Sequence, residues 1–308
     1  MSKITFKLFG KSEKGGYSMK NINLGQLYKK ARIDRGLSLK NAGQGVLSKS
    51  TLSDFERNNT DIKFSSFQGL LKNLNITFHE LLLVENDHEL ESFAKTWEQA
   101  KKDYYSGNIK ALRGLLKRQE FNLKNQEIEV IYDKLNYLQL KNIASRLDES
   151  LILSSSEKEE IIDYLNKVRH WNYYDTTLYS NILDTLTTEA ILDLSEKVVT
   201  RSGTFNAIPG HKQLIIGVLV NTTVTLVNRG KITEAIQFGK QAEGLVDETE
   251  LFWRLKLHFT NGEIDYYQGN HEAGKEKMLA VVDICEKIGS PNLAASYYED
   301  YGDLIKKF

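Results

Sequence analysis

One short segment recurs along the chain and limits how the chain can fold. YYSGNIKA occupies residues 104–111, and YYQGNHEA occupies residues 266–273. A third relative, NRGKITEAI, lies at 228–236 and places Gly230 thirty-nine residues before Gly269. Aromatic residues that close one helix, a glycine turn and an alanine in the next helix are typical of tetratricopeptide-like hairpins. We therefore expect stacked pairs of helices.

The remaining composition favours an all-α chain with more than one domain. Proline occurs only at positions 209 and 291, and helix-forming residues are abundant, so long helices can run uninterrupted. We predict a flexible extension over residues 1–19, a helix-turn-helix domain over 20–84 and a right-handed tetratricopeptide-like solenoid over 85–308. No apolar run is long enough to cross a membrane, and the N-terminus lacks the apolar core of a signal peptide. We therefore expect a cytoplasmic protein.

The net charge of zero hides an uneven distribution of charged residues. Residues 1–83 contain 14 Lys or Arg against 6 Asp or Glu, a net charge of +8, whereas residues 84–308 contain 27 against 35, a net charge of −8. A basic small domain joined to an acidic large one indicates a polyanionic partner for the first domain. Double-stranded DNA is the leading candidate, provided that the residues of the basic domain form a suitable pattern.

The basic segment from Leu24 to Val84 divides into about five short amphipathic helices. Gly36 is placed to end the first helix, and Ser38 and Ser48 are placed to cap the N-termini of the second and third. The apolar residues of the third helix point to one side, so its polar residues form a stripe on the other. This arrangement predicts a helix, a tight turn and a recognition helix.

Short polar side chains in that stripe suit the reading of base edges in the major groove. The predicted base-reading residues are Lys49, Ser50, Ser53 and Asp54. Other basic and hydroxyl side chains would hold phosphates, which supplies affinity without reading sequence. The predicted phosphate contacts are Lys29, Lys30, Arg32, Ser38, Lys40 and Arg57.

These residues also carry a resemblance. LGQLYKKARIDRGLSLKNAGQGVLSKSTLSDFERNNTDIKFSSFQGLLKNLNITFHELL is similar to phage-repressor-like helix-turn-helix domains, and above all to those of the Rgg/GadR/MutR regulators. The likeness continues at W-N-Y-Y-D-x-x-L-Y-x-N (171–181), V-L-V-N-T (218–222) and Y-Y-Q-G-N (266–270). Gly43 and Gly45 depart from the bulkier helix formers of that group, which predicts a short second helix.

The resemblance implies a homodimer that regulates transcription. It also implies that a short, imported, hydrophobic signalling peptide binds on the concave face of the solenoid. In that group, this binding changes gene activity. It leaves open whether the peptide activates or represses, and whether it changes the affinity for DNA or the recruitment of RNA polymerase.

A separate pattern lies in the large domain. Asn181, Asn221 and Asn261 recur at intervals of forty residues, close to the length of one helix pair. An amide side chain both donates and accepts, so a row of asparagines would hold an extended peptide backbone. The alternative is that each asparagine caps a turn or bonds to a helix carbonyl. Trp171 is a further predicted peptide contact, whereas we assign the other tryptophans to packing.

The sequence shows no pattern of catalytic or metal-binding residues. The single cysteine, Cys285, excludes a cysteine zinc cluster, and neither His79 nor His88 is followed by a second histidine at the spacing of zinc proteases. We therefore predict no enzyme activity, no metal and no cofactor. Two rival functions remain: a helix-turn-helix repressor controlled by a protein partner or another small ligand, and an adaptor that no longer binds DNA.

Overall fold

The computed structural model describes residues 7–11, 17–21, 23–78, 80–81, 92–125, 131–203 and 210–308. Helices dominate these ranges, as the sequence predicted, and one small two-stranded sheet accompanies them. The chain forms two compact units, Met1–Asp148 and Glu149–Phe308. The predicted domain boundary between residues 84 and 85 lies outside the described residues.

The sheet is a feature that the helical patterns did not indicate. Strands β1 (Lys7–Lys11) and β2 (Tyr17–Asn21) pair in antiparallel register, with Phe9 opposite Met19. The structure differs here from the flexible extension predicted over residues 1–19. Pairing two strands satisfies backbone donors and acceptors between segments that are separate in sequence, and a search for helical periods does not detect such pairing.

Four helices follow the hairpin: α1 (Leu24–Asp34), α2 (Leu39–Ala42), α3 (Lys49–Glu56) and α4 (Phe64–Leu74). The two predicted caps are present, because the hydroxyl oxygens of Ser38 and Ser48 accept hydrogen bonds from the first turns of α2 and α3. The fifth predicted helix, toward Val84, extends into residues outside the described ranges.

The short second helix has a steric cause. A Cβ atom on Gly43 would lie 2.7 Å from the backbone oxygen of Leu47, and Gly45 has a φ of 73°, in the left-handed region. The helix ends at Ala42 because the turn that follows needs both glycines. The departure from the bulkier residues of similar sequences therefore builds the turn between α2 and α3.

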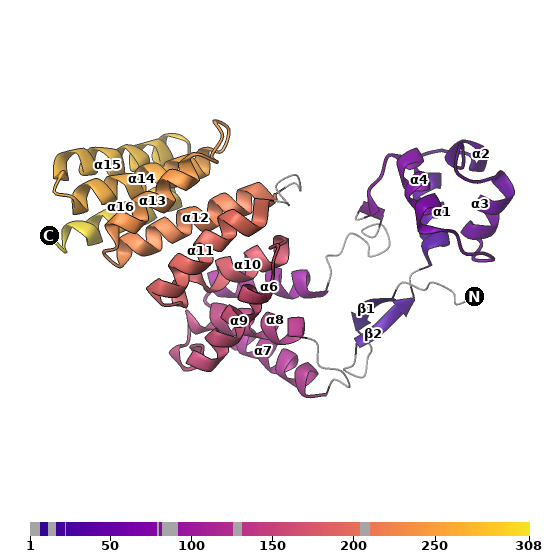
Figure 1. The fold of residues 1–308 in the computed structure, drawn as a ribbon, viewed down its shortest axis with the longest axis horizontal. Helices are drawn as coiled ribbons and strands as arrows, with labels where there is room; N and C mark the ends of the chain where they lie inside the picture. Colours follow the sequence, from indigo (N-terminus) through magenta and orange to yellow (C-terminus); the bar gives the residue numbers. More distant parts are fainter. Residues whose placement is uncertain are drawn as a thin grey trace. The chain divides into compact units, whose positions relative to one another are not determined.

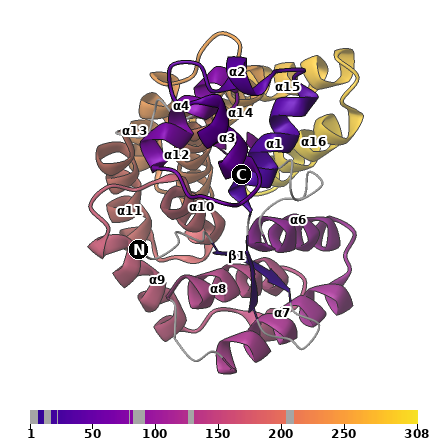
Figure 2. The same ribbon diagram turned by 90° about the vertical axis from the view of Figure 1, so that its right-hand side faces the viewer.

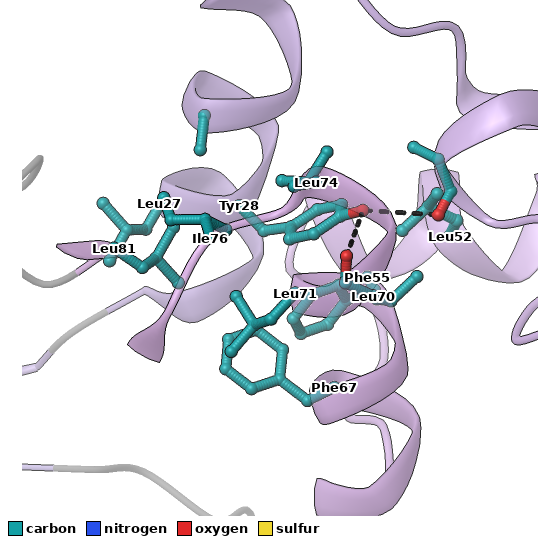
Figure 3. Packing of buried hydrophobic residues seen from close by; sticks show 12 residues of the cluster. Leu27, Tyr28, Leu52, Phe55, Phe67, Leu70, Leu71, Leu74, Ile76 and Leu81 are labelled. Carbon is teal, nitrogen blue, oxygen red and sulfur yellow. Dashed lines mark hydrogen bonds between the residues drawn. The ribbon is translucent and has the colours of Figure 1, made fainter. Parts of the chain in front are cut away.

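The core of this bundle is organised around Tyr28. The ring is fully buried, and the hydroxyl lies 3.4 Å from the backbone oxygens of both Ala42 and Leu70 (Figure 3). Phe55 of α3 lies beside Tyr28 and meets Phe67 of α4 edge to face. One tyrosine thus ties α1 to α2 and α4 while its polar end remains hydrogen-bonded inside an apolar core.

Three further helices complete the first unit: α6 (Ser92–Tyr105), α7 (Ile109–Lys124) and α8 (Ile131–Ser145). Helices α6 and α7 form a hairpin whose turn contains Gly107 with a φ of 67°. This is the first of the three repeated segments, and its predicted helix–turn–helix form is confirmed.

The second unit is a stack of helices (Figures 1 and 2). After a 3-10 turn (Glu149–Leu151) it contains α9 (Ser155–Lys167), α10 (Tyr173–Ile182) with a second 3-10 turn (Leu183–Thr185), α11 (Thr188–Ser202), α12 (His211–Asn228), α13 (Ile232–Glu243), α14 (Leu251–Tyr267), α15 (His271–Lys287) and α16 (Pro291–Ile305). Gly230 and Gly269, both with positive φ, turn α12 into α13 and α14 into α15. The other two repeated segments are therefore helix hairpins as well.

The helices of the second unit form two layers. Consecutive members of the set α10, α12, α14 and α16, which we call the inner helices, contact one another more extensively than do α11, α13 and α15, the outer helices. A stack of helix pairs curves toward the layer whose helices lie closer together. The face presented by the inner helices, called the inner surface below, is therefore the concave one.

The pair of α14 and α15 depends on close backbone approach. A Cβ atom on Gly262 of α14 would lie 2.8 Å from the backbone oxygen of Gly274 on α15. By contrast, a Cβ atom on Gly302 of α16 would have no neighbour within 4 Å. The first glycine permits the packing, and the second is a helix glycine without a packing role.

We expect Gly262→Ala to destabilise the second unit by about 1–3 kcal/mol, because α14 and α15 must separate to admit the methyl group. Gly302→Ala is the matched control and should stabilise it by up to about 1 kcal/mol through helix propensity. Urea unfolding followed by circular dichroism measures both changes. Equal effects of the two substitutions would contradict the close-packing argument.

Candidate DNA and ligand interfaces

Helix α3 presents its polar residues to solvent. Leu52, Phe55 and Glu56 are buried, whereas Lys49 and Ser50, in the first turn, are exposed. The Ser48 hydroxyl accepts from the backbone of Thr51 at 3.1 Å and fixes where the helix begins. The predicted stripe is therefore held on a well-defined helix end, which is the part of a recognition helix that reaches base edges.

Arg32 does not belong to this polar surface. Its Nε and Nη2 donate to the two carboxylate oxygens of Glu56 at 2.6 and 2.7 Å, and its Nη1 donates to the Leu37 oxygen at 2.7 Å. Arg32 is 9% exposed and Glu56 is 3% exposed. We therefore correct the prediction that Arg32 holds a phosphate: its guanidinium is consumed by a buried, two-pronged ion pair that joins α1 to the end of α3.

Two other predicted DNA residues bond to each other. Arg57 Nη2 lies 2.7 Å from Asp54 Oδ1, and both side chains are exposed. An exposed pair of this kind contributes little free energy and exchanges readily for another partner. Ser53 is partly buried one position before Asp54. Ser38 is exposed and caps α2, so its hydroxyl proton remains available to an external acceptor.

The basic residues of α1 border an open depression. It has a volume of about 530 Å³ and is lined by Gln26, Lys29, Lys30, Ile33, Asp34, Glu56 and Arg57. Sequence reasoning found the three basic residues but missed Gln26 and Ile33. Lys40, the remaining predicted phosphate contact, is exposed in α2 and does not line the depression.

The three regularly spaced asparagines lie on consecutive inner helices, and two of them bond to different neighbours. Asn221 of α12 accepts a hydrogen bond from Lys256 Nζ at 2.8 Å. Asn261 of α14 instead donates to Glu243 of α13 at 2.7 Å, beside a groove of about 440 Å³ that α13, α14 and α15 line. Asn181, near the end of α10, is partly buried. Equal spacing therefore did not give Asn221 and Asn261 equivalent partners.

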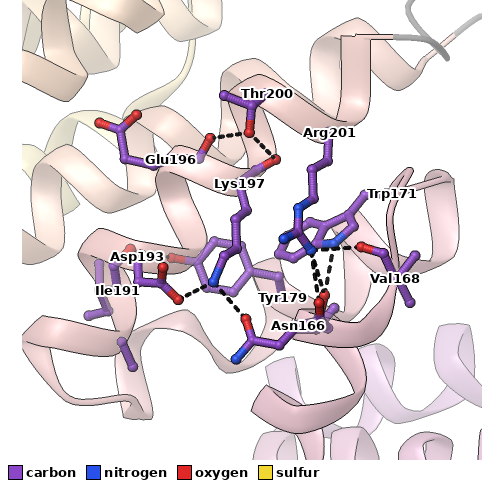
Figure 4. A network of polar contacts seen from close by, with 12 residues as sticks. Asn166, Val168, Trp171, Tyr179, Ile191, Asp193, Glu196, Lys197, Thr200 and Arg201 are labelled. Carbon is purple, nitrogen blue, oxygen red and sulfur yellow. Dashed lines mark hydrogen bonds and ion pairs between the residues drawn. The ribbon is translucent and has the colours of Figure 1, made fainter.

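Trp171 is a core residue rather than a ligand contact. It is fully buried, its indole N–H donates to the Leu165 oxygen at 3.1 Å, and its ring meets Tyr179 edge to face (Figure 4). Arg201 Nη1 donates to the Asn166 and Val168 oxygens at 3.1 and 2.7 Å. Together Trp171 and Arg201 satisfy the carbonyl groups at the end of α9. The prediction that Trp171 binds peptide is therefore corrected.

Sequence reasoning missed the charged residues of the inner surface. Lys256 and Glu263 stand seven residues apart on α14 and so project from the same side of that helix. Burial lowers the pKa of Lys256. The negative charges of Asp300 and Glu263 partly offset this shift. Burial, and then the nearby charge of Asp300 on α16, raises the pKa of Glu263 to about 7. Ionisable side chains whose pKa values are shifted by burial together with nearby charges are frequent in functional sites.

Within the described residues, no helix is long and apolar enough to cross a membrane. The same residues contain no group of three or more His, Cys, Asp or Glu side chains arranged to hold a metal ion.

Comparison with known families identifies the chain. The family described as HTH-type transcriptional regulator Rgg, C-terminal domain, matches residues 115–299, which is more than half of the sequence. The chain belongs to this Rgg family. The resemblance drawn from the sequence is therefore confirmed, and the family is one of transcriptional regulators.

Solved structures share the Rgg fold along most of the chain. The SHP pheromone receptor Rgg2 of Streptococcus dysgalactiae has a TM-score of 0.78 at 23% identity, over 91% of this chain and 99% of the receptor. A protein of Listeria monocytogenes EGD-e has a TM-score of 0.78 at 18% identity, over 92% and 98%. PrgX in its complex with cCF10 has a TM-score of 0.67 at 16% identity, over 91% and 99%.

We expect Arg32→Ala to destabilise the helix-turn-helix bundle by about 3–5 kcal/mol, because it leaves the Glu56 carboxylate buried and unpaired. The double variant Arg32→Met, Glu56→Leu should recover most of that loss, because it removes both charges at similar volume. Urea unfolding measures the stabilities, and fluorescence anisotropy measures binding to DNA. A stable double variant that had lost DNA affinity would show that Arg32 contacts phosphate after all.

The raised pKa of Glu263 predicts a pH-dependent stability. The folded protein favours the protonated carboxyl, so the stabilisation is complete below the ordinary pKa of 4.5 and is lost as pH rises through about 7. Glu263→Gln should therefore leave the melting temperature nearly unchanged at about pH 5 and raise it at about pH 8. The exposed change Glu272→Gln controls for the loss of one charge. A shift of equal size at both pH values would refute the raised pKa.

Proposed function

We propose that this Rgg-family chain is a DNA-binding transcriptional regulator that responds to a short signalling peptide. The observation that carries the DNA half is a capped α3 whose exposed first turn presents Lys49 and Ser50. Ser53 and Asp54 lie one turn further along the helix and would read the adjacent bases. Arg32 is excluded from the phosphate contacts because it is buried and paired. The proposed phosphate contacts are therefore Lys29, Lys30, Ser38, Lys40 and Arg57.

The peptide half of the proposal rests on the inner surface. Among proteins of the same fold, Rgg2 is described as an SHP pheromone receptor, and PrgX is described in a complex with cCF10. The concave side of a helix-pair stack offers an extended surface that suits an extended chain. Asn181, Asn221 and Asn261 are the proposed contacts to the peptide backbone, and Asn221 and Asn261 would have to share or exchange the partners described above.

We further propose that the regulator acts as a homodimer in the cytoplasm, since a protein with two-fold symmetry reads paired half-sites on DNA. RNA polymerase would be a partner in activation.

A second candidate has one observation in its favour. The charges of Lys256 and Glu263 on the inner surface fit poorly with a wholly apolar peptide, because burying an unpaired charge is costly. Control by a small charged ligand or by a protein partner would avoid that cost. Either the ligand is not a peptide, or the peptide itself carries a complementary charge.

A titration of the full chain against its own upstream DNA by fluorescence anisotropy tests the proposal. Lys49→Glu should reduce specific affinity by at least about tenfold, because it replaces a base-reading donor with a charge that phosphates repel. Lys287→Glu, an exposed change on α15, is the matched control and should bind as the unaltered protein does. Normal operator binding by Lys49→Glu would disprove the assignment of α3.

The same titration, repeated with short hydrophobic peptides encoded near the gene, tests the peptide half. A saturable response that Asn221→Ala weakens, while leaving DNA affinity unchanged, is the expected result. Specific DNA binding without any peptide response would favour the second candidate. Absence of specific DNA binding would favour an adaptor.

A further inference from the structure

The hydrogen bond between α12 and α14 fixes the direction of an amide on the inner surface. Lys256 Nζ donates to Asn221 Oδ1 at 2.8 Å. Because the lysine can only donate, the amide oxygen of Asn221 must face it, which leaves the amide nitrogen outside this hydrogen bond. In the described part of the chain, that nitrogen has no hydrogen-bond partner.

The lysine itself lacks an anionic partner. Among the described residues no carboxylate lies within ion-pair distance of Lys256, although the side chain is partly buried. Of the three protons on its ammonium group, one is used by Asn221. Burial lowers its pKa, which means that the charged form is poorly compensated in the free protein.

The position of the pair points toward a ligand. Lys256 donates a hydrogen bond to Asn221 of α12, and the negative charge of Asp300 on α16 acts on its pKa. Lys256 therefore lies within the layer of inner helices. Its neighbours at that surface are the amide of Asn221, the carboxyl group of Asp300 and, about two turns further along α14, Glu263. A carboxylate has two oxygens and only accepts, which matches two neighbouring groups that only donate.

We propose that Lys256 and Asn221 form a subsite that binds a carboxylate of the ligand on the inner surface. The inference builds on the peptide half of the proposed function and names the charge that the peptide carries. Lys256 Nζ donates to one carboxylate oxygen, and Asn221 Nδ2 donates to the other, while the bond between the two side chains is kept. Glu263 and Asp300 repel a carboxylate from the adjacent part of α14 and α16, and so set its position.

Two peptide groups supply this chemistry, the carboxyl terminus and the side chain of Asp or Glu. Three probes of similar size separate them: N-acetyl-leucyl-leucine with a free carboxylate, N-acetyl-aspartyl-leucine amide with a side-chain carboxylate, and N-acetyl-leucyl-leucine amide with neither. Ligand-observed NMR on the full-length protein ranks their affinities and needs no knowledge of the natural ligand.

We expect at least one carboxylate probe to bind about tenfold or more tightly than the neutral amide, as charge-assisted hydrogen bonds to a partly buried site require. Whichever carboxylate probe is preferred identifies the source. Lys256→Met, which keeps the apolar stem, should abolish the preference, and Asn221→Leu should reduce it. Lys275→Met, an exposed change on α15, should preserve it.

Equal affinities of the three probes for the unaltered protein, or no binding of any of them, would overturn the subsite, and so would a preference that persists in Lys256→Met. The comparison of probes on the unaltered protein decides the matter even if a variant does not fold. If a carboxylate probe is preferred but no peptide alters DNA binding, the subsite stands and the peptide half of the proposed function fails. If a peptide alters DNA binding but the probes show no carboxylate preference, only the subsite fails.

Discussion

The close approach of paired helices is the constraint on which the second unit depends. The backbones of α14 and α15 meet at Gly262 and Gly274, and α14 in turn packs against α12 and α16. Lys256 and Glu263 of α14 are partly buried. Their burial shifts both pKa values, and the nearby charge of Asp300 on α16 adds to the shift of Glu263 and opposes that of Lys256.

The helix-turn-helix bundle depends on a different kind of contact. Arg32 and Glu56 are buried together and link α1 to the end of α3, while Tyr28 links α1 to α2 and α4. Both interactions place polar groups in the core with their hydrogen bonds satisfied. These interactions fix the orientation of α3, and the exposed side chains of α3 are not the ones that hold the bundle together. A helix fixed in this way holds its exposed side chains in defined positions, as a binding surface requires.

What the sequence predicted well was local. Serine caps, glycine turns and the inward positions of α3 depend on residues a few positions apart, and the structure has them where they were expected. The errors concern contacts between different elements. Arg32 looked like a surface residue because its partner Glu56 is 24 positions away, on another helix. Trp171 lies close in sequence to its partners Leu165 and Tyr179, but these belong to two different helices, and the sequence does not show how those helices pack. The antiparallel hairpin is likewise a pairing between two elements.

The asparagines show why spacing alone cannot define a binding surface. Forty residues separate each from the next, but the turn glycines at 230 and 269 are thirty-nine residues apart, so the asparagines shift by one position relative to the helix pairs. One position on an α-helix is a rotation of about 100°. Asn221 consequently meets Lys256 on the inner helices, whereas Asn261 turns toward Glu243 on α13. A strict repeat would have placed the second amide at position 260, which is occupied by Thr260, on the same side of α14 as Lys256 and Glu263.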